Sequence, residues 1–267
     1  MTHLLQRGCF AVSTIAILVL IRSSSYGAAT PVLGDPDPLA SIDPQIRRVT
    51  PHVFAIGAVS LDQEQRTVSF PVSINQRTGI VEYAVVTTAG KTHESVFRTV
   101  AQPVHIHIAM LLLGVKPAST NSFPADLSVP PPGEAVSLEV SWPAGNREVR
   151  HPLEEFIVTG NNQHPLPPGP WIYNGSYLAR RNFMAQRDGS IVSVHIDPDA
   201  LVNNPRSGRD HDDLHEVNSQ ILPPDGLPLE ITLRLSADRP PTAASPTNAL
   251  AKPNPSNPAD PPPLKPH

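Results

Sequence analysis

The chain between residues 52 and 237 consists mainly of short apolar runs separated by polar turns. The runs are rich in Val, Ile, Phe and Tyr, a composition typical of β-strands. Eight of them are predicted to be strands, at 52–62, 66–75, 80–88, 134–142, 171–175, 182–186, 190–196 and 227–235. The links between the first three are short, which favours antiparallel neighbours. Pro71 lies inside the second run and predicts an edge position or a bulge there.

Two segments carry the start and stop signals of helices instead. Residues 103–114 begin with proline and end with glycine, and residues 152–160 do the same with two acids in the first turn. The predicted fold class is therefore α+β: a largely antiparallel β-sheet with two short helices, in a single domain.

The N-terminus has the order of a secretory signal. Arg7 precedes an apolar run at 9–21, and small residues follow it up to Ala29. We expect residues 1–29 to be a signal peptide, and the protein to be periplasmic or extracellular with no membrane span after cleavage. The run is short for a membrane span, which needs about twenty residues. The alternative is an uncleaved anchor, which Arg22 just after the run would suit.

Proline marks the segments that flank the domain. Residues 30–51 have few large apolar side chains and are predicted to be a linker to a globular domain at 52–237. Ten of the last 28 residues are proline, and no aromatic residue occurs after 237. Such a segment buries too little surface to offset its ordering entropy, so residues 238–267 are predicted to be a disordered proline-rich tail.

Charge and cysteine content exclude several classes of function. The net charge is -4, which gives no support to nucleic-acid binding. Cys9 is the only cysteine and would leave with the signal peptide. The mature chain would then hold no iron–sulfur cluster, no disulfide and no thiolate nucleophile.

Residues 88–94 pose the first question about chemistry. Thr88 to Lys91 resemble a tight turn, which predicts an antiparallel hairpin with His93 and Glu94 on opposite faces of its second strand. Glu94 would lie on the more apolar face. A carboxylate there must be paired, hydrogen-bonded or raised in pKa, unless it sits in water at the rim of the sheet.

His105 and His107 depend on the same distinction between helix and strand. On a helix they point about 200° apart and cannot share a metal ion, whereas on a strand they would share a face. The helix is favoured, and it places His107 beside Met110 and Leu111.

The segment 209–218 is the third candidate. His211 and His215 have the spacing of a zinc-protease motif, but Asp212 stands where glutamate would act as the base. The alternatives are a solvated acidic loop and a hard-cation site with Asp210, Asp212 and Asp213 as oxygen ligands. Further upstream, Asp197 followed by Pro198 predicts the start of a helix.

Four motifs in order, GKTHES, HIHIAMLLLG, WIYNGS and DPDALVNN followed by an acidic cluster, resemble the YdjY-type domain of exported bacterial proteins. The resemblance covers about 53–236 and implies a single exported domain without an established function. Some members of the family have been described as ferredoxin-like, and the absence of cysteine from the mature chain departs from that description. The resemblance directs attention to the polar residues inside its motifs: His93, Glu94, His107, Asn174, Asn203, Asp212 and Asp213.

Two functional hypotheses follow. The first is a non-enzymatic envelope module that binds a partner, a glycan or a cation. The second is a metal-dependent hydrolase in which Glu94, His107 and Asp212 or Asp213 hold a divalent metal, with His93 as a further ligand.

Overall fold

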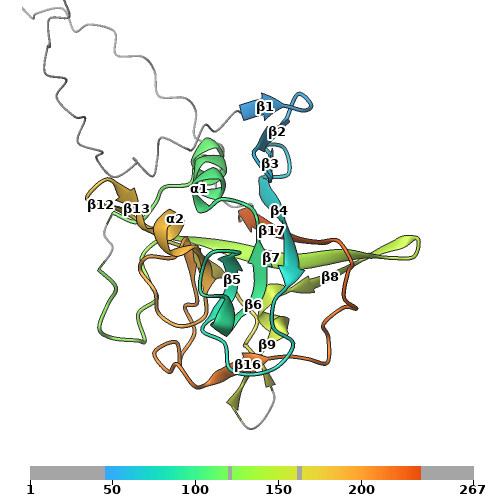
Figure 1. The fold of residues 1–267 in the computed structure, drawn as a ribbon. Coiled ribbons are helices and arrows are strands. Elements are labelled where there is room, and N and C mark those ends of the chain that lie inside the picture. The colour runs from blue at the N-terminus through green and yellow to red at the C-terminus, as the bar shows by residue number, and fades with distance from the viewer. Residues whose placement is uncertain (1–45, 120–121, 161–163, 236–267) are drawn as a thin grey trace, which may run out of the picture. The chain divides into compact units, whose positions relative to one another are not determined.

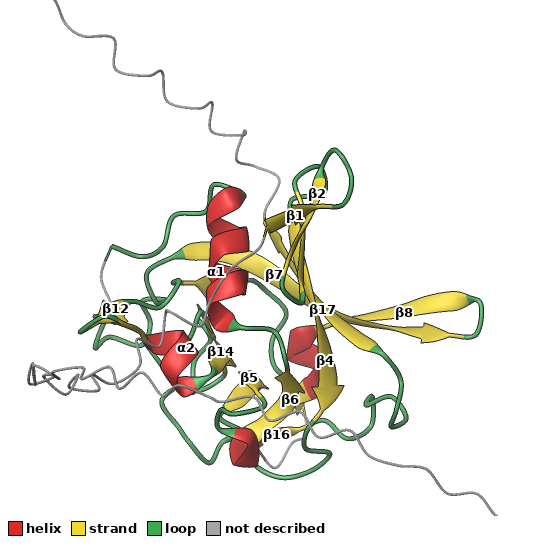
Figure 2. Cartoon of the chain, turned by 45° about the horizontal axis from the view of Figure 1, so that its top comes forward, coloured by secondary structure: helices red, strands yellow, loops and turns green. Residues whose placement is uncertain are grey.

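The computed structural model describes residues 46–119, 122–160 and 164–235. The predicted signal peptide, all of the linker but its last residues, and the predicted proline-rich tail lie outside these residues. Within them, the chain is mostly β-structure (Figure 2).

The centre of the fold is a closed barrel of eight strands. It closes because β4 pairs with β17 on one side and with β6 on the other, at the two ends of one continuous series of pairings (Figure 1). In order around the barrel, the strands are β4 (Thr67–Ile74), β17 (Leu229–Leu235), β7 (Glu134–Ala144), β11 (Trp171–Tyr173), β15 (Val202–Asn203), β14 (Ser190–Ser193), β5 (Tyr83–Thr87) and β6 (Ser95–Thr99).

The predicted α+β class, with its largely antiparallel sheet, is therefore wrong. The barrel is mixed, because β14 pairs with β15 and β5 pairs with β6 in parallel. The short link between β5 and β6 had indicated a hairpin. Instead, residues 88–94 run back along β5 and include a 3₁₀ turn, η1 (Thr92–Glu94), before β6 starts beside Tyr83. A parallel crossover usually needs a dozen residues or more, so the short link could not indicate this one.

The remaining strands extend the barrel wall or form small separate sheets. β1 (Ile46–Arg48), β2 (Val53–Ile56) and β3 (Val59–Asp62) continue the sheet from β4, and β8 (Arg147–Pro152) forms a long hairpin with β7 (Figures 1 and 2). The small sheets comprise β9 (Ile157–Thr159), β10 (His164–Pro165) and β16 (His215–Val217), and separately β12 (Leu178–Ala179) and β13 (Asn182–Phe183).

The predicted helix at 103–114 is confirmed. It is α1 (Pro103–Leu112), with proline in its first turn and Gly114 at φ 82° just beyond its end. It packs against β2, β3 and β4 and contributes Ile106, Ala109 and Met110 to the core. The other α-helix of the described residues is the short α2 (Met184–Asp188). No helix in these residues has the length and apolar character needed to cross a membrane.

The predicted helix at 152–160 is wrong. The segment forms one 3₁₀ turn, η2 (Leu153–Phe156), and then the strand β9. Glu154 does not stay in water at a helix start. It is buried and accepts hydrogen bonds from the Trp171 indole at 3.2 Å and from the backbone of Gly169 at 3.3 Å. β-branched residues follow at 157–159 and pair with β16, which favours extended backbone.

The predicted strand at 52–62 is two strands joined by a tight turn at Gly57. This glycine has φ 57°, and a Cβ there would overlap the His105 ring, with Cε1 only 2.7 Å away. The turn can therefore lie directly under α1 only because residue 57 has no side chain.

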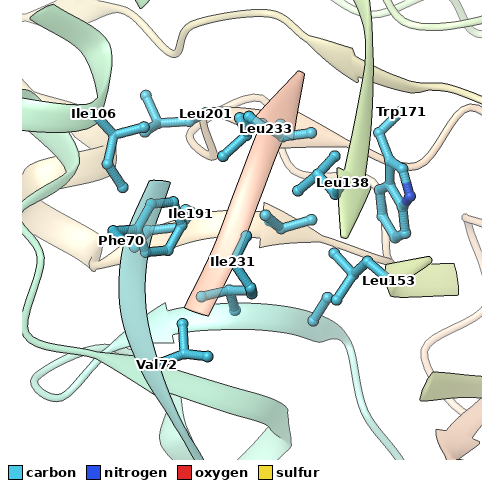
Figure 3. Packing of buried hydrophobic residues seen from close by; sticks show 14 of the residues in the cluster. Phe70, Val72, Ile106, Leu138, Leu153, Trp171, Ile191, Leu201, Ile231 and Leu233 are labelled. Carbon is cyan, nitrogen blue, oxygen red and sulfur yellow. The ribbon is translucent and has the colours of Figure 1, made fainter. Parts of the chain in front are cut away.

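Apolar side chains alternate with polar ones along β4, β7 and β17, and the apolar ones fill the interior. The register pairs Leu233 with Leu138 and Ile231 with Phe70, so rows of large side chains meet across three strands (Figure 3). Phe70, Leu138, Ile231 and Leu233 are each 1% exposed or less. Each such side chain contributes about 1.5–3 kcal/mol to folding.

The barrel's parallel crossover generates a testable prediction at Gly189, which has φ 68°. A Cβ at this position would overlap Thr87 Oγ1 and lie 2.8 Å from Gly90 Cα. Gly145, at the tip of the β7–β8 hairpin, has φ 63° and nothing within 4 Å of the same point. We expect Gly189→Ala to lower the free energy of unfolding by about 3 kcal/mol and Gly145→Ala by about 1 kcal/mol.

The measurement is urea unfolding of both variants. Because the two glycines have nearly the same φ, the difference between the variants isolates the crowding around the crossover. Equal losses would contradict the close packing of Gly189 against β5 and Gly90.

Candidate functional site

A cavity of about 420 Å³ lies between α1 and the hairpin formed by β12 and β13. Its walls are mostly apolar, which is the usual character of small-molecule sites. The lining residues are Val104, His107, Pro117, Ala118, Gly175, Ser176, Tyr177, Leu178 and Phe183. Its volume falls within the range of about 300–1,000 Å³ that ligand pockets occupy.

His107 is the one titratable base in the cavity wall. Its ring packs on Phe183, with centroids 4.9 Å apart, and its Nδ1 lies 2.7 Å from the Tyr173 hydroxyl. Burial lowers the pKa of His107 to about 4, so the ring is neutral at pH 7. Tyr173 is fully buried, and burial raises the pKa of its phenol, so this hydroxyl keeps its proton.

These facts define the tautomer of His107. The described residues offer the Tyr173 hydroxyl no acceptor other than His107 Nδ1, so the phenol donates to that nitrogen. The imidazole proton is then on Nε2. Because the ring forms part of the cavity wall, this N–H is the donor that a ligand would meet.

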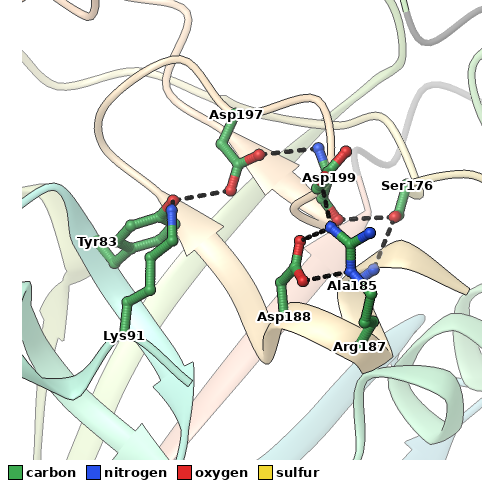
Figure 4. A network of polar contacts seen from close by, with 8 residues as sticks. All are labelled: Tyr83, Lys91, Ser176, Ala185, Arg187, Asp188, Asp197 and Asp199. Atoms are coloured by element: carbon green, nitrogen blue, oxygen red, sulfur yellow. Dashed lines mark hydrogen bonds and ion pairs between the residues drawn. The ribbon is translucent and has the colours of Figure 1, made fainter.

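Ser176 connects the cavity to a network of charged residues (Figure 4). Its φ is 56°, and its hydroxyl donates to the Asp199 carbonyl at 2.7 Å while accepting from the Ala185 backbone N–H at 3.0 Å. The second of these bonds holds the start of α2. The cavity wall is thus fixed to α2 and to the 197–200 turn through one side chain.

Arg187 joins two carboxylates in this network. It donates to Asp188 in a bidentate pair at 2.5 and 2.6 Å and reaches Asp199 at 3.4 Å. The bond from Arg187 lowers the pKa of Asp188, whereas burial raises the pKa of Asp199. The arginine thus compensates for the close approach of two acids beside the cavity.

A second group of contacts anchors the β5–β6 crossover. The Tyr83 hydroxyl accepts from Lys91 Nζ and donates to Asp197 at 2.9 Å (Figure 4). Burial, followed by the charge of Asp197, raises the pKa of Tyr83, so the phenol remains a donor. The loop that carries His93 and Glu94 is therefore attached to the turn that follows β14.

Asn174 and Asn203, both predicted as polar candidates, do lie together. Asn203 Nδ2 donates to Asn174 Oδ1 at 2.9 Å and to the Asp197 carbonyl at 2.8 Å, and its Oδ1 accepts from the Asp197 N–H at 2.9 Å. Asn174 also donates to the Ala200 carbonyl at 3.0 Å. Both are buried, and these bonds hold the 197–200 turn.

The same contacts explain why Asp197 and Pro198 do not begin a helix. Asp197 Oδ1 accepts from the Asp199 N–H at 2.9 Å, which closes a turn in which the side chain replaces a backbone acceptor. The two asparagines then occupy backbone groups that a helix would have needed.

The predicted hairpin at 88–94, with His93 and Glu94 on opposite faces, is wrong. Both residues belong to η1 and not to a strand, and His93 Nε2 lies 3.5 Å from Glu94 Oε2. The His93 side chain is 78% exposed and that of Glu94 is 20% exposed. Glu94 therefore has a partner near the surface.

Asp212 and Asp213 are exposed in the loop before β16, as is His211. His215 differs from them, because it starts β16 and is buried. Burial, with a smaller contribution from His195 and His211, lowers the pKa of His215 to about 4. His211 and His215 are therefore not neighbours on one face of a helix, as a zinc-protease motif requires. His211 is exposed in a loop, and His215 is buried at the edge of a small sheet.

The negative charges of Glu94 and Asp212 both affect the pKa of one carboxyl group, that of Glu82. Burial raises the pKa of Glu82, and the charges of Glu94 and Asp212 raise it further. His107 is held elsewhere, against Tyr173 and Phe183. Among residues 46–119, 122–160 and 164–235, no three His, Cys, Asp or Glu side chains form a group that could hold a metal ion. Metal binding by His93, Glu94, His107, Asp212 or Asp213 stays a prediction.

Sequence reasoning missed most of the residues around the cavity. Tyr173, Phe183 and Asp188 come from β11, β13 and α2, and Asp199 comes from the turn between β14 and β15. Their proximity depends on the barrel topology. Only local signals were present: Asp-Pro-Asp at 197–199 indicates a turn, and Gly175 followed by Ser176 indicates a break after β11.

These features define a class of protein: a mixed eight-stranded barrel with a helix-covered, largely apolar cavity beside a charged network. The YdjY domain family model matches residues 59–234, and the chain belongs to this family. No curated protein and no solved structure matches it.

The asparagine pair generates a prediction about stability. Asn203→Ala leaves the buried Asn174 amide and the Asp197 N–H without their partner, and we expect a loss of about 2 kcal/mol in the free energy of unfolding. Asn174→Ala should cost a similar amount. Because the two residues share one network, the double variant should lose about 1 kcal/mol less than the sum of the single losses.

Urea unfolding of the original protein, the two single variants and the double variant gives the coupling energy between Asn174 and Asn203. Additive losses would mean that the two amides act independently, contrary to the geometry.

The buried histidines generate a prediction about pH. The pKa values of His107 and His215 are lowered to about 4 from 6.5. Between these values the unfolded chain binds protons that the folded chain does not. The free energy of unfolding should therefore fall as the pH drops from 6.5 to 4, by on the order of 2 kcal/mol for each histidine.

The measurement compares urea unfolding at several pH values in the original protein and in His107→Leu. Between pH 6.5 and 4, the free energy of unfolding of His107→Leu should fall by on the order of 2 kcal/mol less than that of the original protein, because one of the two histidines is gone. His164→Gln, which removes an exposed histidine, serves as the control and should leave the pH dependence unchanged. An identical pH dependence in His107→Leu and the original protein would contradict the burial of a neutral His107.

Proposed function

We propose that the chain is a non-enzymatic binding module of the bacterial envelope, and that it holds a small, mostly apolar molecule in the cavity between α1 and the β12–β13 hairpin. The proposal keeps the non-enzymatic envelope module of the first sequence hypothesis but replaces its partner, glycan or cation with a small apolar ligand. The observation that carries it is the cavity itself: about 420 Å³, apolar walls, and one neutral imidazole whose N–H is left over after the bond to Tyr173.

The polar groups near the cavity support binding more than catalysis. The negative charges of Asp188 and Asp199 are paired with Arg187. The Ser176 hydroxyl is used in two hydrogen bonds to backbone groups. His107 has a low pKa of about 4 and a phenol as its partner, whereas a general base at neutral pH works best with a pKa near the operating pH. The hydrolase hypothesis gains no specific support from this arrangement.

An envelope location fits the same proposal. The apolar run at 9–21 has the form of an export signal, and a carrier of apolar molecules has a role between membranes or outside the cell, where such molecules need a protected path. The uncleaved anchor remains the alternative for the attachment of the protein.

The test uses the neutral fluorescent dye Nile red as a ligand of the full chain. We expect saturable binding that Val104→Trp weakens at least tenfold, because the indole would fill the cavity that Val104 lines. Leu112→Trp is the matched control. This residue is on the same helix, is 46% exposed and does not line the cavity, so the variant should bind the dye as the original protein does.

Melting temperatures of both variants show whether they fold. Absence of saturable binding in the original protein, or equal weakening by the two tryptophans, would overturn the proposal.

A further inference from the structure

Basic residues adjoin the lining residues on both walls of the cavity. Lys116 immediately precedes Pro117 and Ala118 in one wall, and Arg180 and Arg181 lie between Leu178 and Phe183 of the other. All three are exposed. No acidic side chain is among the residues that line the cavity, and within the described residues neither arginine forms an ion pair.

The two arginines occupy a turn that does not suit them. β12 and β13 pair Ala179 with Asn182, so Arg180 and Arg181 form the whole two-residue loop. Their φ angles are 48° and 72°, and a loop with positive φ at both positions strongly favours Asn-Gly or Gly-Gly. Backbone preference therefore does not account for these two residues, whereas a role for their charges would.

Exposed apolar side chains lie on the same two elements that line the cavity. Leu178 is 68% exposed at the hairpin. On α1, Leu111 shares a face with Val104 and His107 and is 43% exposed. Exposed apolar side chains and three basic residues thus adjoin the lining of the cavity.

We infer that the ligand is a single-chain anionic amphiphile, with its aliphatic chain in the cavity and a carboxylate or similar anion at Lys116, Arg180 and Arg181. This inference rests on the proposed function and adds the charge and shape of the ligand. Charge complementarity with these basic residues, not the cavity alone, carries it.

The test is competition against Nile red with three probes of equal chain length: decanoate, decanol and decyltrimethylammonium. At low salt we expect decanoate to bind about tenfold more tightly than decanol, and the cation more weakly than either. The advantage of decanoate should shrink as salt is added, because the arginines are exposed to solvent.

The decisive variant combines Arg180→Asn with Arg181→Gly. It removes both charges and places the residues that the turn prefers, so the hairpin should fold at least as well. We expect most of the advantage of decanoate over decanol to be lost, with Lys116 retaining the remainder, while the affinity for decanol stays the same. Arg147→Asn, at the exposed tip of the distant β7–β8 hairpin, is the control and should change neither affinity.

The outcomes distinguish two claims: that the cavity binds an apolar molecule, and that this molecule carries an anionic group. If Nile red and decanol bind but decanoate shows no advantage, the anionic ligand is wrong and the cavity remains a binding site. If no probe binds, the proposed function fails with it. Binding only to anionic phospholipid vesicles, unaffected by Val104→Trp, would place the charges on a membrane-docking surface and overturn the inference.

Discussion

The fold depends on β4 serving two partners along one of its edges. Its other edge pairs with β17 through residues 67–72. On the shared edge, β3 pairs with residues 67–69 and β6 with residues 73–74. Pro71 lies between the two, where it has no N–H to leave unpaired, and its carbonyl accepts a bond from the Thr99 hydroxyl. This change of partner closes the barrel and sends the chain from β6 directly into α1, above β2–β4.

The position of the cavity follows from this closure. α1 is held over β2, β3 and β4, and the turn at Gly57 admits the ring of His105 beneath it. The opposite face of α1 then meets the segment after β11, where Gly175 and Ser176 both have positive φ and turn the chain outward. The network of Ser176, Asp199 and Arg187 fixes that segment to α2. The cavity is the space that these restrained elements leave between them.

Local patterns in the sequence were sufficient for single elements but not for their pairing. Proline and glycine at its ends located α1, and alternating residues located β4, β7 and β17. The β5–β6 crossover could not be inferred, because its stability comes from Tyr83, Lys91 and Asp197, and Asp197 is distant in the sequence. Because a hairpin was predicted instead, His93 and Glu94 were assigned to a strand, whereas they belong to η1. Likewise, the cavity combines α1 with residues 175–183, and no local pattern links the two segments.

The polar residues of the shared motifs differ in whether their hydrogen-bonding capacity is used within the protein. Asn174 and Asn203 bind each other and the backbone of the 197–200 turn, so their burial is explained by structure. His107 is only partly buried, and the Tyr173 phenol satisfies its Nδ1 alone. Its Nε2 has no hydrogen-bond partner among the described residues and is not one of the buried unpaired atoms, so it is open to the cavity. A ligand acceptor in the cavity can bond to this nitrogen, and this is why His107, rather than the asparagines, marks the site.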